Sequence, residues 1–198
     1  MSIYQGDQNK EKLFHFFLEL IDTYEHAIGD LEKRLKKENN KPPSSIYEPV
    51  VNRLYIEWLL EFLKKNRTDL LEAEKKIKSI DKKFSSIRET WKNEYINQML
   101  ELFRENIKIY NPEDALLDSD LFELNIRIRN HIEAMKIELE LLSNIEYEIN
   151  EIKQKDGIFI GIIPETIHRK TYLPNDLPYS PPDIWWRHLV EKYGEPAD

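Results

Sequence analysis

Hydrophobic residues recur with helical spacing over about forty positions, from Asp69 to Tyr110. The steps alternate between three and four residues, which is a heptad pattern. The apolar members of this stripe are Leu70, Ala73, Ile77, Ile80, Phe84, Ile87, Trp91, Tyr95, Met99, Leu102 and Phe103. No glycine or proline interrupts the stripe, so it predicts one helix of roughly 60 Å at 1.5 Å per residue. A stripe of that length needs partner helices to cover it.

Three other segments have helical apolar spacing and can supply these partners: residues 9–38, 48–64 and 120–155. Two prolines in the polar stretch 39–45 separate the first two segments. Asp69, with Glu72 three residues later, has the pattern of a capping box. This favours a turn at residues 64–69 over the alternative, a single helix from residue 49 to residue 110. Gly157 indicates where the last helix ends.

The composition changes after Asp156, because six of the ten prolines and three of the five glycines follow it. The β-branched run 158–163, closed by Pro164, predicts a short strand. Prolines favour an extended segment at 171–182, and a short helix is expected from there to Tyr193. We therefore predict an all-α, elongated antiparallel helical bundle with coiled-coil character. Its body is residues 1–156, and residues 157–198 form a proline-rich, aromatic tail with one short strand and one short helix.

Composition narrows the class of protein further. Of 198 residues, 33% are charged and 40% are hydrophobic, which is apolar enough to fold. The net charge of -8 argues against a dedicated nucleic-acid binder. Without cysteine the chain has no disulfide, thiolate metal site or cysteine nucleophile. It shows no signal-peptide pattern and no apolar run of about 20 residues, so we expect a cytoplasmic protein that does not insert in a membrane.

Aromatic residues in the tail are the strongest indication of function, because such side chains dominate buried contacts and interfaces. The tail either folds back along the body or docks on a partner. The candidate partner-binding residues are Ile158, Phe159, Ile160, Ile162, Tyr172, Tyr179, Trp185, Trp186, Leu189 and Tyr193. The unequal helix lengths also predict uncovered apolar stripe, and hence association with another protein or a second copy. We expect a non-enzymatic scaffold, adaptor or regulatory subunit that needs no cofactor.

Two other functions are open. Arg127 and His131 lie one helical turn apart and could act on a phosphodiester as charge stabiliser and general base. This pair resembles the Arg and His motif of HEPN-type ribonucleases, which implies a helical ribonuclease, although three residues separate the pair here and that family has four to six. The lysine-rich segment 64–92 could instead bind nucleic acid through Lys75, Lys78 and Lys82, opposite the apolar stripe. No metal site is expected. A di-iron bundle needs a Glu-x-x-His motif from each of two helices, and this sequence does not supply two such motifs.

Overall fold

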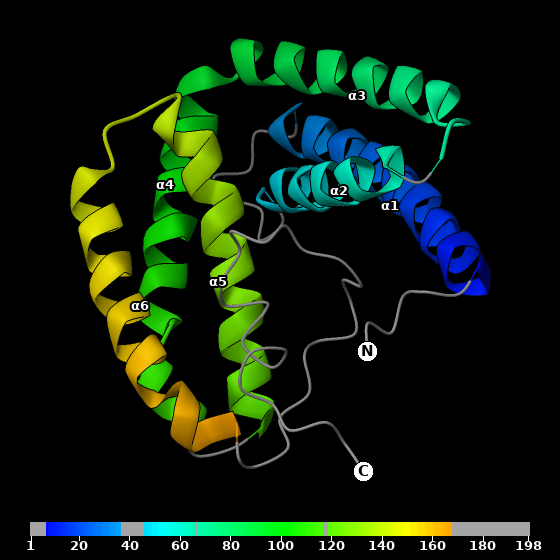
Figure 1. Cartoon of the computed structure of the whole chain (residues 1–198). Helices are drawn as coiled ribbons and strands as arrows, with labels where there is room; N and C mark the ends of the chain where they lie inside the picture. Colours follow the sequence, from blue (N-terminus) through cyan, green and yellow to red (C-terminus); the bar gives the residue numbers. More distant parts are fainter. Residues whose placement is uncertain (1–6, 37–45, 66, 117–118, 168–198) are drawn as a thin grey trace. The chain divides into compact units, whose positions relative to one another are not determined.

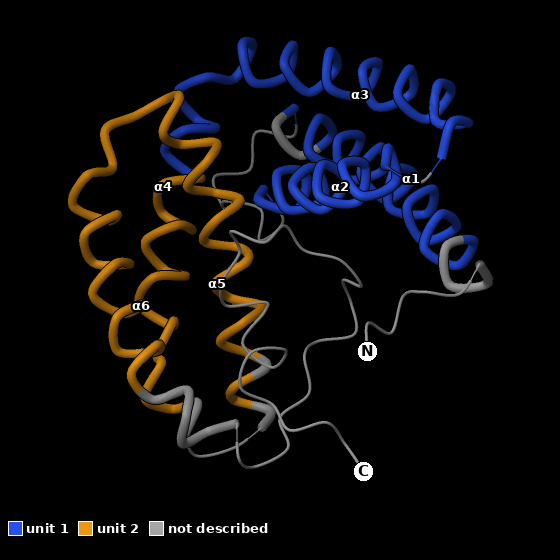
Figure 2. The backbone as a smooth tube through the Cα atoms, viewed as in Figure 1, with its two compact units in different colours: residues 1–98 blue, residues 99–198 orange. Residues whose placement is uncertain are grey.

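The computed structural model describes residues 7–36, 46–65, 67–116 and 119–167, and every regular element in these ranges is helical (Figure 1). The predicted all-α class is therefore confirmed. The elements are α1 (Asp7–Lys36), α2 (Glu48–Lys64), α3 (Leu71–Thr90), α4 (Lys92–Ile109), the 3-10 helix η1 (Pro112–Leu116), α5 (Ser119–Glu140) and α6 (Glu146–Ile167). They form two compact units, residues 1–98 and 99–198, which divide within α4 (Figure 2).

The first unit packs α1, α2 and α3 around one apolar core. Each helix has an amphipathic pattern, and its apolar side is the side that is buried. The fully or almost fully buried side chains include Phe17, Tyr24, Ile28, Ile56, Leu59, Ile77 and Phe84. The Tyr24 and Phe84 rings meet edge to face, with centroids 6.3 Å apart. The first turns of α4 also belong to this unit, where the Tyr95 ring meets Phe84 at 6.0 Å.

The predicted turn between the second and third helices is present at residues 65–70. Arg67 donates its backbone N–H to the Leu63 carbonyl at 2.8 Å, and its guanidinium lies 3.9 Å from the centre of the Phe14 ring. The predicted capping box is wrong, because Leu70 occupies the N-cap position without a side-chain hydrogen bond. The Asp69 carboxylate instead accepts two hydrogen bonds from Arg67, at 2.8 and 2.6 Å.

The predicted single helix over residues 69–110 is also wrong, since α3 ends at Thr90 and α4 begins at Lys92. Trp91 leaves the helical conformation with φ -119° and ψ 32°. Its N–H still bonds to the Ile87 carbonyl, and its own carbonyl accepts from Tyr95. The apolar stripe itself is buried on both sides of the break. Helices of the same chain cover this stripe. It therefore does not support the prediction that an exposed part of the stripe drives association with another protein.

The second unit packs the rest of α4 with η1, α5 and α6. Its fully buried side chains include Phe103, Tyr110, Phe122, Ile126, Ile132, Met135, Leu139 and Phe159. Phe159 joins the core by contact with the Phe122 ring at 5.6 Å and the Tyr110 ring at 6.1 Å. Phe122 lies in the first turn of α5, and Phe159 lies in the second half of α6. The contact between their rings therefore packs the start of α5 against α6.

The last predicted helix, residues 120–155, is two helices in the structure. The chain turns after Glu140, where the Leu139 carbonyl accepts from Leu142 and Ser143, and the Asn144 side chain accepts the Glu146 N–H at 3.1 Å. The predicted strand at 158–163 is wrong, because α6 continues through Gly157 to Ile167. A short run of isoleucines fits a strand and a buried helix equally. Here Asp156 and Phe159 both need the helical spacing to reach their partners in the core.

Candidate functional site

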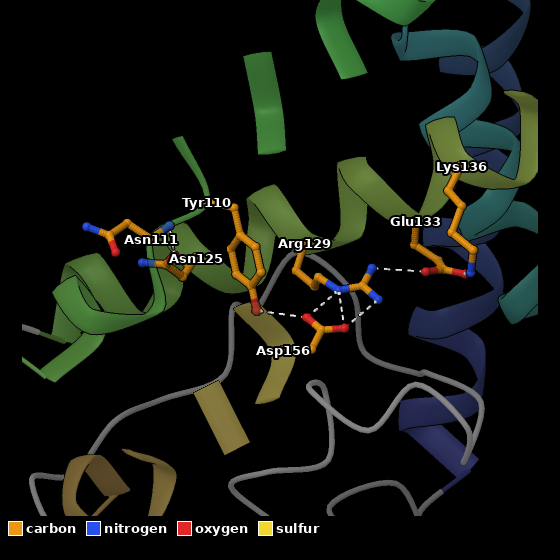
Figure 3. Close-up of polar contacts among 7 residues, drawn as sticks. All are labelled: Tyr110, Asn111, Asn125, Arg129, Glu133, Lys136 and Asp156. Carbon is orange, nitrogen blue, oxygen red and sulfur yellow. Dashed lines mark hydrogen bonds and ion pairs between the residues drawn. The ribbon is translucent and has the colours of Figure 1, made fainter. Parts of the chain in front are cut away.

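A buried network of charged and polar side chains in the second unit is the most concentrated group of chemically active residues in the structure (Figure 3). It connects Tyr110, directly after α4, with Arg129 and Glu133 of α5 and Asp156 of α6. Arg129 is only 5% exposed, and charged residues are seldom buried so deeply unless they are paired. The network is therefore a candidate site, and its geometry shows whether its side chains could act in catalysis or hold the helices together.

Arg129 is paired through all three of its guanidinium nitrogens. Its Nε and Nη2 bind the two oxygens of Asp156 at 3.0 and 3.1 Å, which is a bidentate arrangement. Its Nη1 donates to Glu133 at 2.9 Å, one helical turn along α5. Lys136 donates to the other oxygen of Glu133 at 3.0 Å, and the Tyr110 hydroxyl donates to Asp156 at 3.1 Å.

The pKa values in this network show which charges the pairing stabilises. Burial opposes the charge of Arg129, but Asp156 and Glu133 outweigh it and raise the Arg129 pKa. Burial would raise the pKa of Glu133, but Arg129 and Lys136 outweigh it and hold that pKa below its ordinary value. Burial, followed by the charge of Asp156, raises the pKa of Tyr110. The pairing thus favours a charged Arg129 and an ionised Glu133, and the burial of Tyr110 favours its protonated hydroxyl.

Further polar contacts around the network satisfy the ends of helices. Lys155 donates to the carbonyl of Ile107, in the last turn of α4, and to that of Tyr110, directly after the helix. Carbonyls at a helix end lack helical partners, so these bonds satisfy them. Asn125 of α5 accepts the Asn111 N–H at 3.0 Å, just before η1. These bonds tie the connection after α4 to α5 and α6. The network and its surroundings therefore position three helices, and their polar groups are engaged with one another.

An open depression of about 590 Å³ lies elsewhere in this unit. It is lined by Arg104, Asn144, Glu146, Tyr147, Glu148 and Asn150. Arg104 and the largely buried Glu148 form an ion pair at 2.6 Å within it. In the part of the chain that the structure describes, no group of three or more His, Asp or Glu side chains could hold a metal ion. No helix there has the length and apolarity needed to cross a membrane.

The residues of the ribonuclease hypothesis lie on α5, on either side of Arg129. Arg127 is exposed and His131 is half-buried, and both take part in interactions within the chain. The lysines of the nucleic-acid hypothesis, Lys75, Lys78 and Lys82, are exposed on α3. Lys75 pairs with Glu72 of its own helix at 2.8 Å. Neighbouring α3 lysines pair with α1, including Lys76 with Asp22 at 2.6 Å.

The candidate partner-binding residues divide into three groups. Ile158 and Ile160 are exposed on α6, by 43% and 51%, whereas Phe159 is fully buried in the core. Ile162 belongs to α6, but its side chain is outside the described part. The remaining candidates also lie outside the described residues: Tyr172, Tyr179, Trp185, Trp186, Leu189 and Tyr193.

Sequence reasoning missed the buried network, although one signal was present. Arg129 lies midway between the apolar residues Ile126 and Ile132 of α5, and Asp156 directly precedes Gly157, where the sequence predicts the end of a helix. Comparison of the chain with known protein families, curated proteins and solved structures gives no match.

Proposed function

We propose that the protein is a non-enzymatic scaffold, adaptor or regulatory subunit that holds another protein through its helical body and the segment that follows α6. The observation that carries this proposal is the distribution of exposed apolar side chains. Among the described residues, seven of the nine large hydrophobic side chains that are exposed belong to the second unit: Ile109, Leu124, Ile137, Leu141, Tyr147, Ile158 and Ile160.

The largest exposures lie around the turn between α5 and α6. Leu141 is 79% exposed and Tyr147 is 78% exposed, while Ile137, 43% exposed, lies in the last turn of α5, four residues before Leu141. Single exposed hydrophobic residues are common on soluble proteins, but neighbouring ones are a feature of interaction surfaces. We define Ile137, Leu141 and Tyr147 as the turn patch. The partner is a protein that offers its own apolar side chains to this patch.

The buried polar network supports binding over catalysis. Arg129, Asp156, Glu133 and Tyr110 are held by one another inside the core, in contacts that fix the helices. A general acid or base must reach the proton that it transfers. The groups whose pKa this network shifts, Tyr110, Arg129 and Glu133, are thus structural, and the exposed surface is what the protein offers to other molecules.

Photo-crosslinking from the turn patch tests the proposal in the full chain. A photoreactive amino acid is placed at Leu141 or at Tyr147 and activated in the native cell, and adducts are identified by mass spectrometry. We expect one partner protein at both positions. The triple variant Ile137→Glu, Leu141→Lys, Tyr147→Glu, probed from Ile158, should reduce adduct formation at least about tenfold, which corresponds to about 1.4 kcal/mol of binding free energy.

The matched control changes three exposed polar residues of the same unit: Glu101→Lys, Lys108→Glu and Lys153→Glu. It should leave adduct formation unchanged. Equal adducts from the triple variant, or a scatter of unrelated proteins at both crosslinking positions, would contradict the proposal. Cleavage of RNA by the purified chain that disappears in His131→Ala would support the ribonuclease hypothesis instead.

A further inference from the structure

The polar linkage around Asp156 has a counterpart around Asp81 in the first unit. There the Tyr24 hydroxyl donates to Asp81 at 3.0 Å, and Arg53 pairs with Asp81 at 2.9 Å. Arg53 also pairs with Glu57, one turn along its helix, at 3.0 Å. In each unit the tyrosine comes from the first helix or its end, the Arg-x-x-x-Glu pair from the second helix and the aspartate from the third.

The aromatic contacts of the two linkages also correspond. Each aspartate is followed three residues later by a phenylalanine, Phe84 in the first unit and Phe159 in the second. Each phenylalanine meets the tyrosine of its own linkage edge to face. The ring centroids are 6.3 Å apart for Tyr24 and 6.1 Å apart for Tyr110, and the interplanar angle is 86° in both. Five residue types thus occur twice, in the same chain order and with the same partner residues, although Arg129 is paired through all three guanidinium nitrogens and Arg53 through two.

The correspondence extends along all three helices when the linkages are aligned. It pairs residues 13–24 with 99–110, 46–64 with 122–140 and 70–87 with 145–162. In the first of these pairs, buried, half-buried and exposed positions agree at every residue. The identical pairs are Phe17 and Phe103, Glu19 and Glu105, Ile21 and Ile107, Tyr24 and Tyr110, Arg53 and Arg129, Ile56 and Ile132, Glu57 and Glu133, Leu63 and Leu139, Ile77 and Ile152, Lys78 and Lys153, Asp81 and Asp156, Phe84 and Phe159, and Ile87 and Ile162.

We infer that the chain is a tandem pair of one three-helix module, with residues 13–87 as the first copy and residues 99–162 as the second. Helical periodicity alone does not produce this alignment, because amphipathic helices also align after a shift of three or four residues. The arginine–aspartate ion pair selects one alignment in the second and third helices, and the tyrosine that donates to the same aspartate selects it in the first. This inference does not depend on the proposed function.

The copies differ mainly in the path between their first and second helices. In the first copy α1 continues past Tyr24 to Lys36 and packs along α2 and α3. In the second copy α4 ends before Tyr110, and the short helix η1 contacts α5 and α6 in the corresponding place. The connection from the second to the third helix differs by one residue. The changes of length thus fall between the aligned segments and leave the linkage residues in register.

The copies also differ on their surfaces. Among the described side chains, every exposed large hydrophobic residue of the second unit aligns with a polar residue of the first, when the alignment of the second helix is extended by one residue to include Leu141. The aligned pairs are Ile109 with Thr23, Leu124 with Glu48, Ile137 with Glu61, Leu141 with Lys65, Tyr147 with Glu72, Ile158 with Lys83 and Ile160 with Ser85. In the opposite sense, the exposed Leu18 of the first unit aligns with the polar Arg104 of the second, and the exposed Leu71 aligns with Glu146. The core is common to both copies, whereas the apolar surface is concentrated in the second.

A stability scan of the full chain tests the duplication. Each position of both copies is replaced by alanine, and the resistance of every variant to a protease is measured, which reports the population of opened chain. The sensitivity profiles of the two copies are then compared at all relative offsets. We expect the highest correlation at the offsets given above in all three helices. We also expect Asp81→Asn and Asp156→Asn each to speed cleavage, by about tenfold or more at Asp156 and by less at Asp81, because the pair of Asp81 with Arg53 is more exposed to solvent.

A highest correlation at another offset in any helix would overturn the inference, even if that offset were a single helical turn away. So would a loss of protease resistance in only one of the two aspartate variants. If either aspartate variant does not fold, Tyr24→Phe and Tyr110→Phe make the same comparison by removing one hydroxyl each. Loss of resistance in only one of these variants would count equally against the inference.

Discussion

Replacing Asp156 is expected to have a large effect on stability, because its carboxylate neutralises a guanidinium inside the core. Replacing it by Asn removes the carboxylate that pairs with Arg129 in bidentate fashion and leaves the ion pair of Arg129 with Glu133. Removing one member of a buried pair costs about 3–5 kcal/mol, so we expect Asp156→Asn to lower the free energy of unfolding by about 3 kcal/mol. Urea unfolding followed by circular dichroism measures this change.

The control for Asp156 is Lys153→Gln, which changes an exposed charge on the same helix. Substitutions of that kind usually alter stability by no more than about 0.5 kcal/mol. An equal loss of stability in both variants would contradict a specific contribution of the ion pair between Asp156 and Arg129.

Tyr24 and Tyr110 predict how stability depends on alkaline pH. Burial, followed by the nearby aspartate, raises the pKa of each hydroxyl above the value of about 10 that it has in the unfolded chain. The unfolded chain therefore loses these protons first, and the stabilisation that is complete below about pH 10 is lost as the pH rises above that value. We expect the urea concentration at the midpoint of unfolding to decrease as the pH is raised from about 9.5 to about 11.

The double variant Tyr24→Phe, Tyr110→Phe separates this effect from the titration of lysines, and its urea midpoint should fall less over the same range. Absorbance of tyrosinate gives an independent measurement, since two of the tyrosines should ionise only when the protein unfolds. Ionisation of both hydroxyls at ordinary pH in the folded chain would contradict the burial of the linkages.

Helix α6 carries two glycines that its helical conformation does not require. Among the described residues, nothing lies within 4 Å of a Cβ added at Gly157 or Gly161, and both positions are exposed. Glycine in a helix interior is less favourable than alanine by about 0.8–1 kcal/mol. Gly157→Ala and Gly161→Ala should each raise the free energy of unfolding by up to about 1 kcal/mol. Thermal unfolding measures the change, and a lower stability would instead show that another segment packs closely on this face.

The prediction of helices from the sequence succeeded where apolar spacing and breaking residues agreed. The segment 48–64 has the predicted bounds, and the turn at 64–69 is present. It failed where a helix ends without glycine or proline, at Trp91 and after Glu140. There the ends follow from packing: residues before Trp91 belong to the core of the first unit, and Phe103 belongs to that of the second.

The buried network was not predicted because its members are far apart in the sequence. Tyr110, Arg129 and Asp156 become neighbours only when three helices are placed in register. The pattern within one helix points instead to Arg127 and His131. These residues lie on either side of Arg129 in the sequence but are less buried than it is. The repeated Arg-x-x-x-Glu and Asp-x-x-Phe patterns were readable, but they are short and gain meaning only from the matching contacts in the two units.

At the scale of the whole molecule, duplication explains how a chain of this length covers its long apolar stripes. Three amphipathic helices close one core, and repeating the module closes a second core without a longer bundle. Each copy then has its own polar linkage, so the register of its helices is set locally. The stripe that suggested a need for partners is satisfied inside the chain, and the exposed apolar residues of the second unit become the feature that favours binding.

Truncation separates the contribution of the modules from that of the residues after them. The described buried side chains all lie before residue 160, so a chain ending at residue 167 should keep the helical circular dichroism and the cooperative unfolding of the full chain. A chain ending at residue 156 also loses Phe159 from between Tyr110 and Phe122. Removal of a buried phenylalanine side chain costs about 3–5 kcal/mol, so this shorter chain should be less stable by at least that amount. If the chain ending at 167 folds but no longer yields the crosslinked partner, residues 168–198 contribute to binding. If it loses cooperative unfolding, those residues belong to the folded core, and the two modules are not sufficient by themselves.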